Sequence, residues 1–355
     1  MSASSRSSSD GRRRRGLAAR AAVPAALLLL GVGAAAPAHA QSKTGTVFGS
    51  FLEIEPSARI AAMGNAGATV PEGLDAVYYN PAAIGRASRW GLSFTHAAWF
   101  ADIAYNYVAA SLPMGRWGNS FLSVTSLNSG DIEVRTVAQP LGTGELFSAS
   151  DVALGLGWGK EITDRFTMGA QVTYVQETIW HSSAGTAVLG FGTLYQVSDR
   201  GLRIGASLSN FGTQTAFAGR DLRATIDADP SRSGDNGALP ASQFTDPFSM
   251  PVMFRVGLGM PIRIDDDHEL RLALDAKHPS DNTESVSAGA ELVYHRSVSL
   301  RWGYQDAFQR DSEVGLTAGA GIEGNTGSRH YQCDYGWADF GRLGNVHRFS
   351  LSLLF

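Results

Sequence analysis

Apolar residues alternate with polar or small residues along most of the chain beyond residue 89, in stretches of about ten residues. This period of two is typical of β-strands, whose successive side chains point to opposite faces. Leu270, Leu272 and Leu274, for example, share one face, and Arg271 and Asp275 lie on the other. The pattern predicts fourteen strands, at residues 90–97, 103–112, 119–136, 150–160, 166–178, 186–198, 201–211, 251–262, 268–277, 284–295, 297–306, 313–323, 329–338 and 345–355.

The predicted connections alternate between tight turns, such as 199–200, and longer loops at 137–149, 179–185 and 212–250. Short turns on one rim and long loops on the other are typical of outer-membrane barrels. A strand of about ten residues, at ~3.3 Å each and tilted by about 40°, spans ~25 Å, the apolar height of such a barrel. We therefore expect an all-β fold, a transmembrane outer-membrane β-barrel of about fourteen antiparallel strands over residues 89–355, with 212–250 as a long surface loop.

The polar faces of the predicted strands combine many glycines with charged residues, among them Arg203, Arg255, Asp275, Glu291 and Arg301. A small dry core would not tolerate these charges, whereas a wide lumen that holds water or a plug would. For some of these charges, we expect pairing with one another as internal struts rather than an ion-selective role for any one of them. Residues 41–88 lack the strand alternation and are long enough to fill a lumen, so we expect them to form an N-terminal plug or hatch.

The first 40 residues are typical of a cleaved export signal. Four arginines at 12–15 precede an apolar run that includes four leucines, and Ala38-His39-Ala40 fits a small-x-small cleavage site. An uncleaved membrane anchor is the competing interpretation. The single cysteine, Cys333, excludes an internal disulfide framework, and the net charge of −4 gives no support to nucleic-acid binding.

Signals for catalysis and for cofactors are absent from the sequence. Neither a Gly-x-Ser-x-Gly elbow nor a His-Glu-x-x-His helix occurs, and the match to Gly-x-Gly-x-x-Gly at 319–324 lies in an alternating strand without a following helix. Asp265, Asp266, Asp267 and His268 could bind a divalent cation, but the EF-hand spacing is missing and a solvated turn is the simpler interpretation. We expect a non-enzyme with no cofactor and no metal.

Several segments resemble the PorV/PorQ family, which is related to the FadL-type long-chain fatty-acid transporters. The similar segments are 51–54, 57–59, 62–66, 80–82, 163–166, 201–212, 275–279 and 339–349, and together they extend over nearly the whole chain after residue 40. The resemblance implies a fourteen-stranded barrel with an internal hatch that contains an Asn-Pro-Ala box, here Asn80, Pro81 and Ala82. It also implies a kink in the third strand that opens the wall sideways into the bilayer.

The predicted third strand is interrupted by Asn128, Ser129, Gly130 and Asp131, a run that disfavours strand pairing. This interruption is a candidate lateral gate, and an ordinary β-bulge or loop is the alternative. For Pro81 of the hatch box, the alternative is that it only shapes a turn. The lateral gate and the hatch box therefore both depend on the family resemblance.

Two classes of function follow from the resemblance. One is a component of type IX-like protein secretion that binds exported proteins with C-terminal signal domains, and the other is a passive FadL-like channel for hydrophobic small molecules. The alternative to both functions is a purely structural outer-membrane protein. For the first class, Phe217, Phe244, Phe248 and Met250 in the long loop are candidate partner-binding residues, unless they pack the loop onto the barrel mouth.

The chain ends on an aromatic residue, Phe355, in an alternating strand. This ending resembles the recognition signal of outer-membrane barrels, so we expect Phe355 to direct insertion by the barrel-assembly machinery. The expected partners are that machinery, outer-membrane lipid, and either secreted proteins or hydrophobic small molecules.

Overall fold

A computed structural model describes residues 45–70, 73–227, 229, 231, 238–310 and 312–355. The predicted signal peptide, residues 1–40, and the first four residues of the predicted plug lie outside the described residues. No helix in the described ranges is long and apolar enough to cross a membrane.

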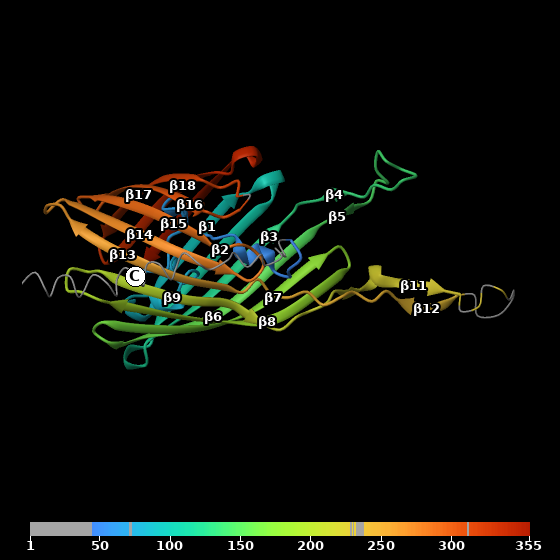
Figure 1. The fold of residues 1–355 in the computed structure, drawn as a ribbon, viewed down its shortest axis with the longest axis horizontal. Helices are drawn as coiled ribbons and strands as arrows, with labels where there is room; N and C mark the ends of the chain where they lie inside the picture. Colours follow the sequence, from blue (N-terminus) through green and yellow to red (C-terminus); the bar gives the residue numbers. More distant parts are fainter. Residues whose placement is uncertain (1–44, 71–72, 228, 230, 232–237, 311) are drawn as a thin grey trace, which may run out of the picture. The chain divides into compact units, whose positions relative to one another are not determined.

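Fourteen antiparallel strands form one closed barrel, as the alternation predicts (Figure 1). Each strand pairs with its neighbours in the chain, β19 pairs with β1, and β8 and β13 both pair with β9, so the ladder has no free edge. The barrel strands are β1 Gly91–Ala98, β2 Ala104–Pro113, β3 Asn119–Asn128, β6 Ala149–Thr163, β7 Phe166–Ile179, β8 Ser182–Gln196, β9 Arg203–Gly212, β13 Met253–Arg263, β14 His268–Pro279, β15 Ser285–Tyr294, β16 Val298–Ala307, β17 Leu316–Thr326, β18 Arg329–Asp339 and β19 Asn345–Leu354.

Two hairpins project from one rim of the barrel (Figure 1). One pairs β4 Ile132–Glu133 with β5 Leu146–Phe147, and the other pairs β11 Arg223–Ile226 with β12 Leu239–Ser242. Before the second hairpin, β10 Ala218–Gly219 pairs with the start of β8. We call this rim the long-loop rim and the opposite rim, where the connection between β6 and β7 is two residues long, the turn rim.

The long loop expected at residues 179–185 is wrong. The strand β7 runs to Ile179 and β8 begins at Ser182, so a two-residue turn connects them. Ser182 and Ala184 are buried on the inner face, and Gly185 and Ala187 are exposed on the outer face. The residues of both faces are small, so their hydrophobicity hardly differs. Small residues on both faces concealed the strand from the pattern of hydrophobicity, although the backbone pairing continues through them.

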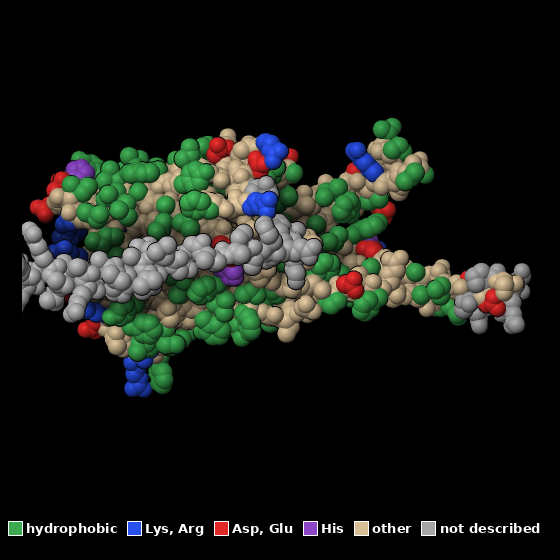
Figure 2. Space-filling model, viewed as in Figure 1, with side chains coloured by type: hydrophobic (Ala, Val, Ile, Leu, Met, Phe, Trp, Pro, Cys, Tyr) green, Lys and Arg blue, Asp and Glu red, His purple; other side chains and the backbone are tan. Residues whose placement is uncertain are grey.

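Hydrophobic side chains cover the outer face of the barrel wall, and most charged side chains lie toward its two ends (Figure 2). Leu154, Leu156, Phe191 and Leu274 on the wall are between 44% and 57% exposed. This outer surface is what a strand needs in contact with hydrocarbon, so the chain is an outer-membrane-type transmembrane β-barrel.

The segment before β1 lies inside the barrel and supplies most of its fully buried apolar side chains, including Ile60, Ala76 and Ile84. It contains η1 Ser50–Glu53, α2 Ala58–Ala61 and η2 Pro81–Arg86. The Ser57 hydroxyl caps α2 by accepting from the Ile60 amide, and the Asn80 side chain caps η2 by accepting from the Ala82 amide. We call residues 46–90 the hatch.

Candidate functional site: the hatch in the barrel lumen

Asn80 of the Asn-Pro-Ala box joins three parts of the structure. Its side-chain nitrogen donates to the carbonyl oxygen of Ala68 in the hatch at 2.8 Å and to that of Thr193 on β8 at 3.0 Å. Its side-chain oxygen accepts from the Ala82 amide at 3.0 Å. Asn80 is completely buried, so each of these polar groups needs the partner that it has. The box therefore anchors the hatch to the wall.

A row of three glycines on the wall receives the box. Gly159, Gly169 and Gly192 are cross-strand partners on β6, β7 and β8. A β-carbon built on Gly169 would lie 2.4 Å from the Pro81 carbonyl oxygen, and one on Gly192 would lie 2.0 Å from the Asn80 side-chain oxygen. Any side chain in this row would displace the hatch backbone, so the glycines set how closely the hatch approaches the wall.

A second group of glycines on the other side of the barrel receives α2 and the turn after it. A β-carbon would lie 2.2 Å from the Met63 carbonyl oxygen if built on Gly289, and 2.5 Å from that of Ala58 if built on Gly336. The glycines that the sequence shows on the polar strand faces are therefore largely docking positions for the hatch backbone.

Ion pairs fix the hatch to strands β15 to β18. Glu291 on β15 accepts two hydrogen bonds from Arg59 of α2, and it also accepts from Arg271 and Arg301. Arg301 in turn donates to Asp334 on β18 at 2.7 Å. Glu291 is 1% exposed, so three guanidinium groups compensate the burial of its charge. The prediction that lumen charges act as struts agrees with this network.

A second charged group holds the hatch near η1. Glu55 of the hatch accepts from Arg255 on β13, and Lys277 on β14 lies 4.0 Å from Glu55 and 2.6 Å from Asp306. Nearby, burial and the neighbouring carboxylates of Asp281 and Glu55 raise the pKa of Glu53 to about 8.

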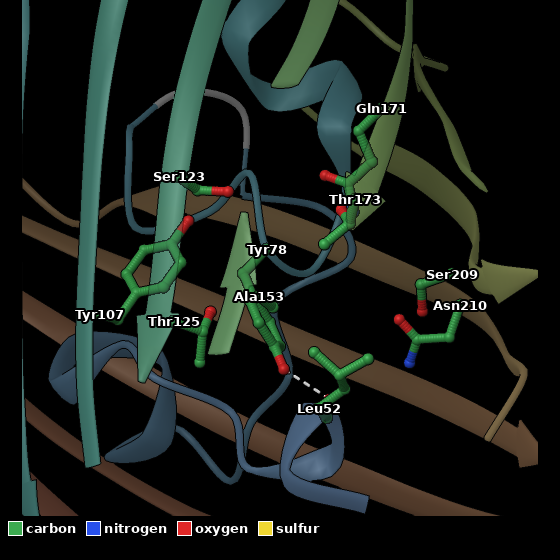
Figure 3. A pocket seen from close by; sticks show the side chains of 10 residues that line it. All are labelled: Leu52, Tyr78, Tyr107, Ser123, Thr125, Ala153, Gln171, Thr173, Ser209 and Asn210. Atoms are coloured by element: carbon green, nitrogen blue, oxygen red, sulfur yellow. Dashed lines mark hydrogen bonds between the residues drawn. The ribbon is translucent and has the colours of Figure 1, made fainter. Parts of the chain in front are cut away.

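A small polar cavity lies where the hatch faces β2, β3, β6, β7 and β9 (Figure 3). Its volume is about 30 Å³, and the lining includes Leu52, Tyr78, Tyr107, Thr125 and Asn210. The Tyr78 hydroxyl donates to the Leu52 carbonyl oxygen across this space, as the dashed line in Figure 3 shows. A cavity that holds benzene measures ~150 Å³, so this one has room only for water. At this place the described part of the hatch leaves no room for a hydrophobic small molecule.

An apolar groove of about 830 Å³ opens at the long-loop rim. Aromatic rings form much of its lining: Phe147 on β5, Trp180 in the β7–β8 turn, and Phe217 and Phe248 in the long loop. At its border, the Asp221 carboxylate accepts from the His181 backbone amide at 2.9 Å. The groove has the size and the apolar lining of a site for a small hydrophobic ligand.

The groove is continuous with the upper face of the hatch. Phe217 and Phe248 line the groove and also pack against a buried cluster formed by hatch, wall and loop residues. The ring of Phe217 meets that of Phe48 edge to face at 6.1 Å, and Leu52 of the same cluster reaches the central cavity. An unbroken series of apolar side chains thus joins the groove to the closed centre of the barrel.

The candidate partner-binding residues of the long loop differ in environment. Met250 is buried in the cluster with the hatch, Phe217 and Phe248 pack against it, and Phe244 is 88% exposed. Three of the four side chains, those of Phe217, Phe248 and Met250, therefore pack the loop onto the barrel mouth. This packing is the alternative to partner binding that the sequence left open.

The candidate gate residues lie at the end of the third strand. Asn128 is the last residue of β3 and pairs with Ala104 and Ser150 on either side, with no register shift along β3. Residues 129–131 connect β3 to β4, and the Asn128 side chain accepts from the Gly130 amide at 2.7 Å. Residues 129–131 are therefore part of a connection at the long-loop rim, and they do not interrupt the paired part of the wall.

An irregularity does occur in the wall between β8 and β9. The pairing shifts between Leu189 and Phe191, so that Ser209 and Asn210 on β9 together oppose Gly190 alone. Asn210 has a φ of 60° and donates to the Pro251 carbonyl oxygen. Ser209 and Asn210 also line the central cavity, so this bulge is where the cavity reaches the wall. The sequence reasoning missed the bulge; an Asn before Phe211-Gly212 was its only signal.

On the turn rim, a cavity of about 590 Å³ lies beneath the hatch. Its lining is charged and includes Arg59, Asp75, Arg203, Glu269 and Arg271. The two ends of the lumen therefore differ in polarity, with the apolar groove on one side of the hatch and a charged vestibule on the other. The exposed turn at 265–268 lies on the same rim, and there the Asp265 side chain accepts from the His268 amide.

Phe355 follows the last residue of β19, and its amide donates to the Trp90 carbonyl oxygen at 2.8 Å. The terminal residue thus joins the strand that closes the barrel to the chain just before β1. Its role in insertion stays a prediction.

No family model and no curated protein matches the chain. Among solved structures, a TodX ΔS2S3 mutant described as a monoaromatic hydrocarbon channel aligns over 85% of this chain and 99% of its own, with 14% identity and a TM-score of 0.52. The Pseudomonas putida toluene transporter TodX aligns over 83% and 96%, with 12% identity and a TM-score of 0.51. A Pseudomonas aeruginosa FadL homologue aligns over 84% and 98%, with 11% identity and a TM-score of 0.48.

None of these comparisons gives support to the PorV/PorQ assignment. At 12–14% identity, the likeness to TodX is a likeness of fold. The chain is an outer-membrane-type β-barrel with the fold of the TodX channel structures.

Proposed function

We propose that this protein is a passive channel that admits small hydrophobic molecules through the outer membrane. The observation that carries the proposal is the apolar groove of about 830 Å³ at the long-loop rim, which is continuous with apolar side chains on the hatch. The fold shared with a monoaromatic hydrocarbon channel supports the same class of cargo.

Entry begins at the four aromatic rings of the groove. A planar apolar ligand gains from contact with Phe147 and Trp180, whose ring centroids lie 6.3 Å apart, in addition to the area it removes from water. From there Phe217 and Phe248 lead to Phe48 and the hatch.

Passage requires the hatch to move, because the cavity of about 30 Å³ cannot hold such a ligand. The glycine row and Asn80 hold the hatch against β6 to β8, on the side where the cavity lies. Ligand that displaces Leu52 and Tyr78 would enlarge this cavity toward the β8–β9 bulge. We infer that the bulge at Asn210 is the lateral exit, since the polar vestibule beneath the hatch is a poor route for an apolar molecule.

The test is uptake of radiolabelled toluene by cells that depend on this protein for its entry. Trp180→Ala removes one ring contact worth ~1 kcal/mol, which should raise the half-saturating concentration roughly fivefold. The matched control is Phe244→Ala, because Phe244 belongs to the same rim, is 88% exposed and does not line the groove. Equal uptake by wild type, Trp180→Ala and a strain without the protein would contradict the proposal.

If the protein instead took part in protein secretion, a different result would be expected. Removal of residues 223–242, which carry the β11–β12 hairpin, would then abolish binding of an exported protein with a C-terminal signal domain and leave toluene uptake unchanged. None of the described residues of the hairpin lines the groove, so a channel should tolerate this deletion. Specific binding of such a protein by the wild type alone would favour secretion over the channel.

A further inference from the structure

The outer wall of the barrel carries a second apolar groove, about 540 Å³ in volume, on strands β1, β17, β18 and β19. Its lining includes Phe94, Ala320, Cys333, Phe349 and Leu351. It opens outward, away from the lumen, and has no part in the path described above. Because the fold places this wall in hydrocarbon, the groove is open to the membrane.

The register explains why the wall is hollow at this point. Ile322, Cys333, Leu351 and Phe94 form one row of cross-strand partners on the outer face. The next row toward the long-loop rim begins with Ala320 and Tyr335. Cys333 and Ala320 are short and lie diagonally next to each other, whereas their neighbours are large. The small side chains of Ala320 and Cys333 thus form the floor of the groove. Aromatic rings and branched aliphatic side chains form its sides.

Tyr335 would cover this floor if it lay flat on the wall. Instead its hydroxyl is hydrogen-bonded to His347 Nδ1 at 2.8 Å, and the two rings stack with centroids 6.0 Å apart. The Tyr335 ring also contacts Phe349, with centroids 5.2 Å apart. His347 therefore holds Tyr335 toward the long-loop rim and keeps the groove open below it.

The outer wall around the groove changes from polar, just beyond its lining, to apolar with depth in the membrane. His347 and the outward-facing His96, which pairs with Asn106, lie near the long-loop rim, and Cys333 and Leu351 lie deeper. The four residues from His347 to Leu351 correspond to about 10 Å of depth. A polar upper end above a narrow apolar slot matches a lipid, whose head group stays at the interface while one chain extends toward the midplane.

We propose that this groove binds one acyl chain of a membrane lipid from the leaflet on the long-loop side, with the lipid's polar group near His347. A second copy of the protein fits less well. In a two-fold contact centred on the groove, the groove would face its own copy, and two facing hollows would leave a void in the interface.

The experiment places the full chain in vesicles of phosphatidylethanolamine and phosphatidylglycerol that contain a trace of phosphatidylethanolamine with a photoactivatable diazirine in mid-chain. After illumination, labelled peptides are identified by mass spectrometry. We expect labelling of β17 and β18 around Ala320 and Cys333 to exceed that of the lipid-facing wall on β7 and β8 severalfold, because a chain seated in the groove makes more packing contacts than one on the rest of the wall and stays there longer.

Cys333→Phe fills the groove and should reduce this labelling to the level of the rest of the wall. Ala187→Phe is the matched control, because Ala187 is a small outward-facing residue on β8, outside the groove. His347→Ala frees Tyr335 to cover the floor and should also reduce labelling, while heat-modifiable migration on gels confirms that each variant folds. Uniform labelling of the wild-type wall, unchanged labelling in Cys333→Phe, or a cross-linked dimer with Cys333 at its interface would overturn the proposal.

Discussion

Arg59 of the hatch and Glu291 of the wall form a two-point ion pair in the lumen, with Nε to Oε1 at 3.1 Å and Nη2 to Oε2 at 2.9 Å. The planar guanidinium presents both donors at once, so the pair fixes the orientation of α2 as well as its position. Arg271 and Arg301 also donate hydrogen bonds to the Glu291 carboxylate. One buried carboxylate that three arginines share therefore holds α2 against the wall.

Glu291→Gln should release α2 from the wall. The substitution leaves three guanidinium groups without their shared charge, and breaking a buried pair in this way costs about 3–5 kcal/mol. Hydrogen exchange of amides 58–64 should then be roughly 100-fold faster or more, provided that the hatch opens separately from the barrel. Glu313→Gln is the control, because Glu313 pairs with the 88% exposed Arg342 outside the lumen. Equal exchange in the two variants would show that the ion pair does not hold the hatch.

Gly169→Ala tests the fit of the hatch box against the wall. The new methyl group would lie 2.4 Å from the Pro81 carbonyl oxygen and 2.6 Å from the Ala82 nitrogen, so the hatch backbone must shift. We expect a folded barrel with faster hydrogen exchange at residues 78–86 and a higher basal toluene uptake.

The control for this change is Gly155→Ala on the neighbouring strand. Its methyl group would contact mainly the hydroxyl groups of Ser123 and Thr173, which belong to the wall. A hatch that exchanges equally fast in both variants would show that the glycine row does not position the box.

The number of barrel strands and most of their bounds follow from local pattern, because every wall residue faces either hydrocarbon or lumen. The predicted third strand, 119–136, is too long, since β3 ends at Asn128 and the chain then leaves the wall. Leu270, Leu272 and Leu274 show this alternation directly, and β14 contains all three. The pattern is weak where small residues occupy both faces, which is why the hairpin at 180–181 was taken for a loop.

The docking of the hatch depends on contacts between residues far apart in the sequence. The Asn80 side chain donates to the Thr193 carbonyl oxygen, and the Ala58 backbone lies against Gly336. Neither contact leaves a trace in the pattern of hydrophobicity. The glycines were visible in the sequence, but their role was not, since a glycine on a strand can equally mark a bulge or a bend. The bulge at Asn210 was missed because only Phe211 and Gly212 follow it in β9, too few residues to show that the alternation has shifted by one.

Glu53 should make the hatch sensitive to pH. Part of its side chain contacts solvent, but the surrounding barrel and the carboxylates of Asp281 and Glu55 raise its pKa from 4.5 to about 8, with Lys277 acting in the opposite direction. A raised carboxyl pKa means that the folded state favours the protonated form. The stabilisation is therefore complete below about pH 4.5 and is lost as the pH rises through about 8.

We expect hydrogen exchange of amides 48–54, corrected for the intrinsic pH dependence of exchange, to become faster between pH 6 and pH 9. Glu53→Gln, which stays neutral, should remove this change. A wild-type hatch whose corrected exchange is flat over this range would contradict the assignment of Glu53.

Deletion of Asn210 should close the lateral exit without disturbing the rest of the wall. Without it, Ser209 would oppose Gly190, and Leu208 and Phe211 would keep their present partners, Phe191 and Leu189. The alternation would then be regular, with Leu208 and Phe211 on the outer face and Ser209 on the inner face. The variant should fold, because the deletion removes the unfavourable φ of 60° at Asn210. Toluene uptake should fall toward that of cells without the protein.

The matched comparison for the exit is Gly130→Val combined with Asn128→Thr, which favours strand conformation in the connection after β3. These positions lie at the rim, above the paired wall, so uptake should stay at the wild-type level if the exit is at Asn210. Loss of uptake in the double variant, with normal uptake after deletion of Asn210, would place the exit at the third strand instead, where the family resemblance puts it.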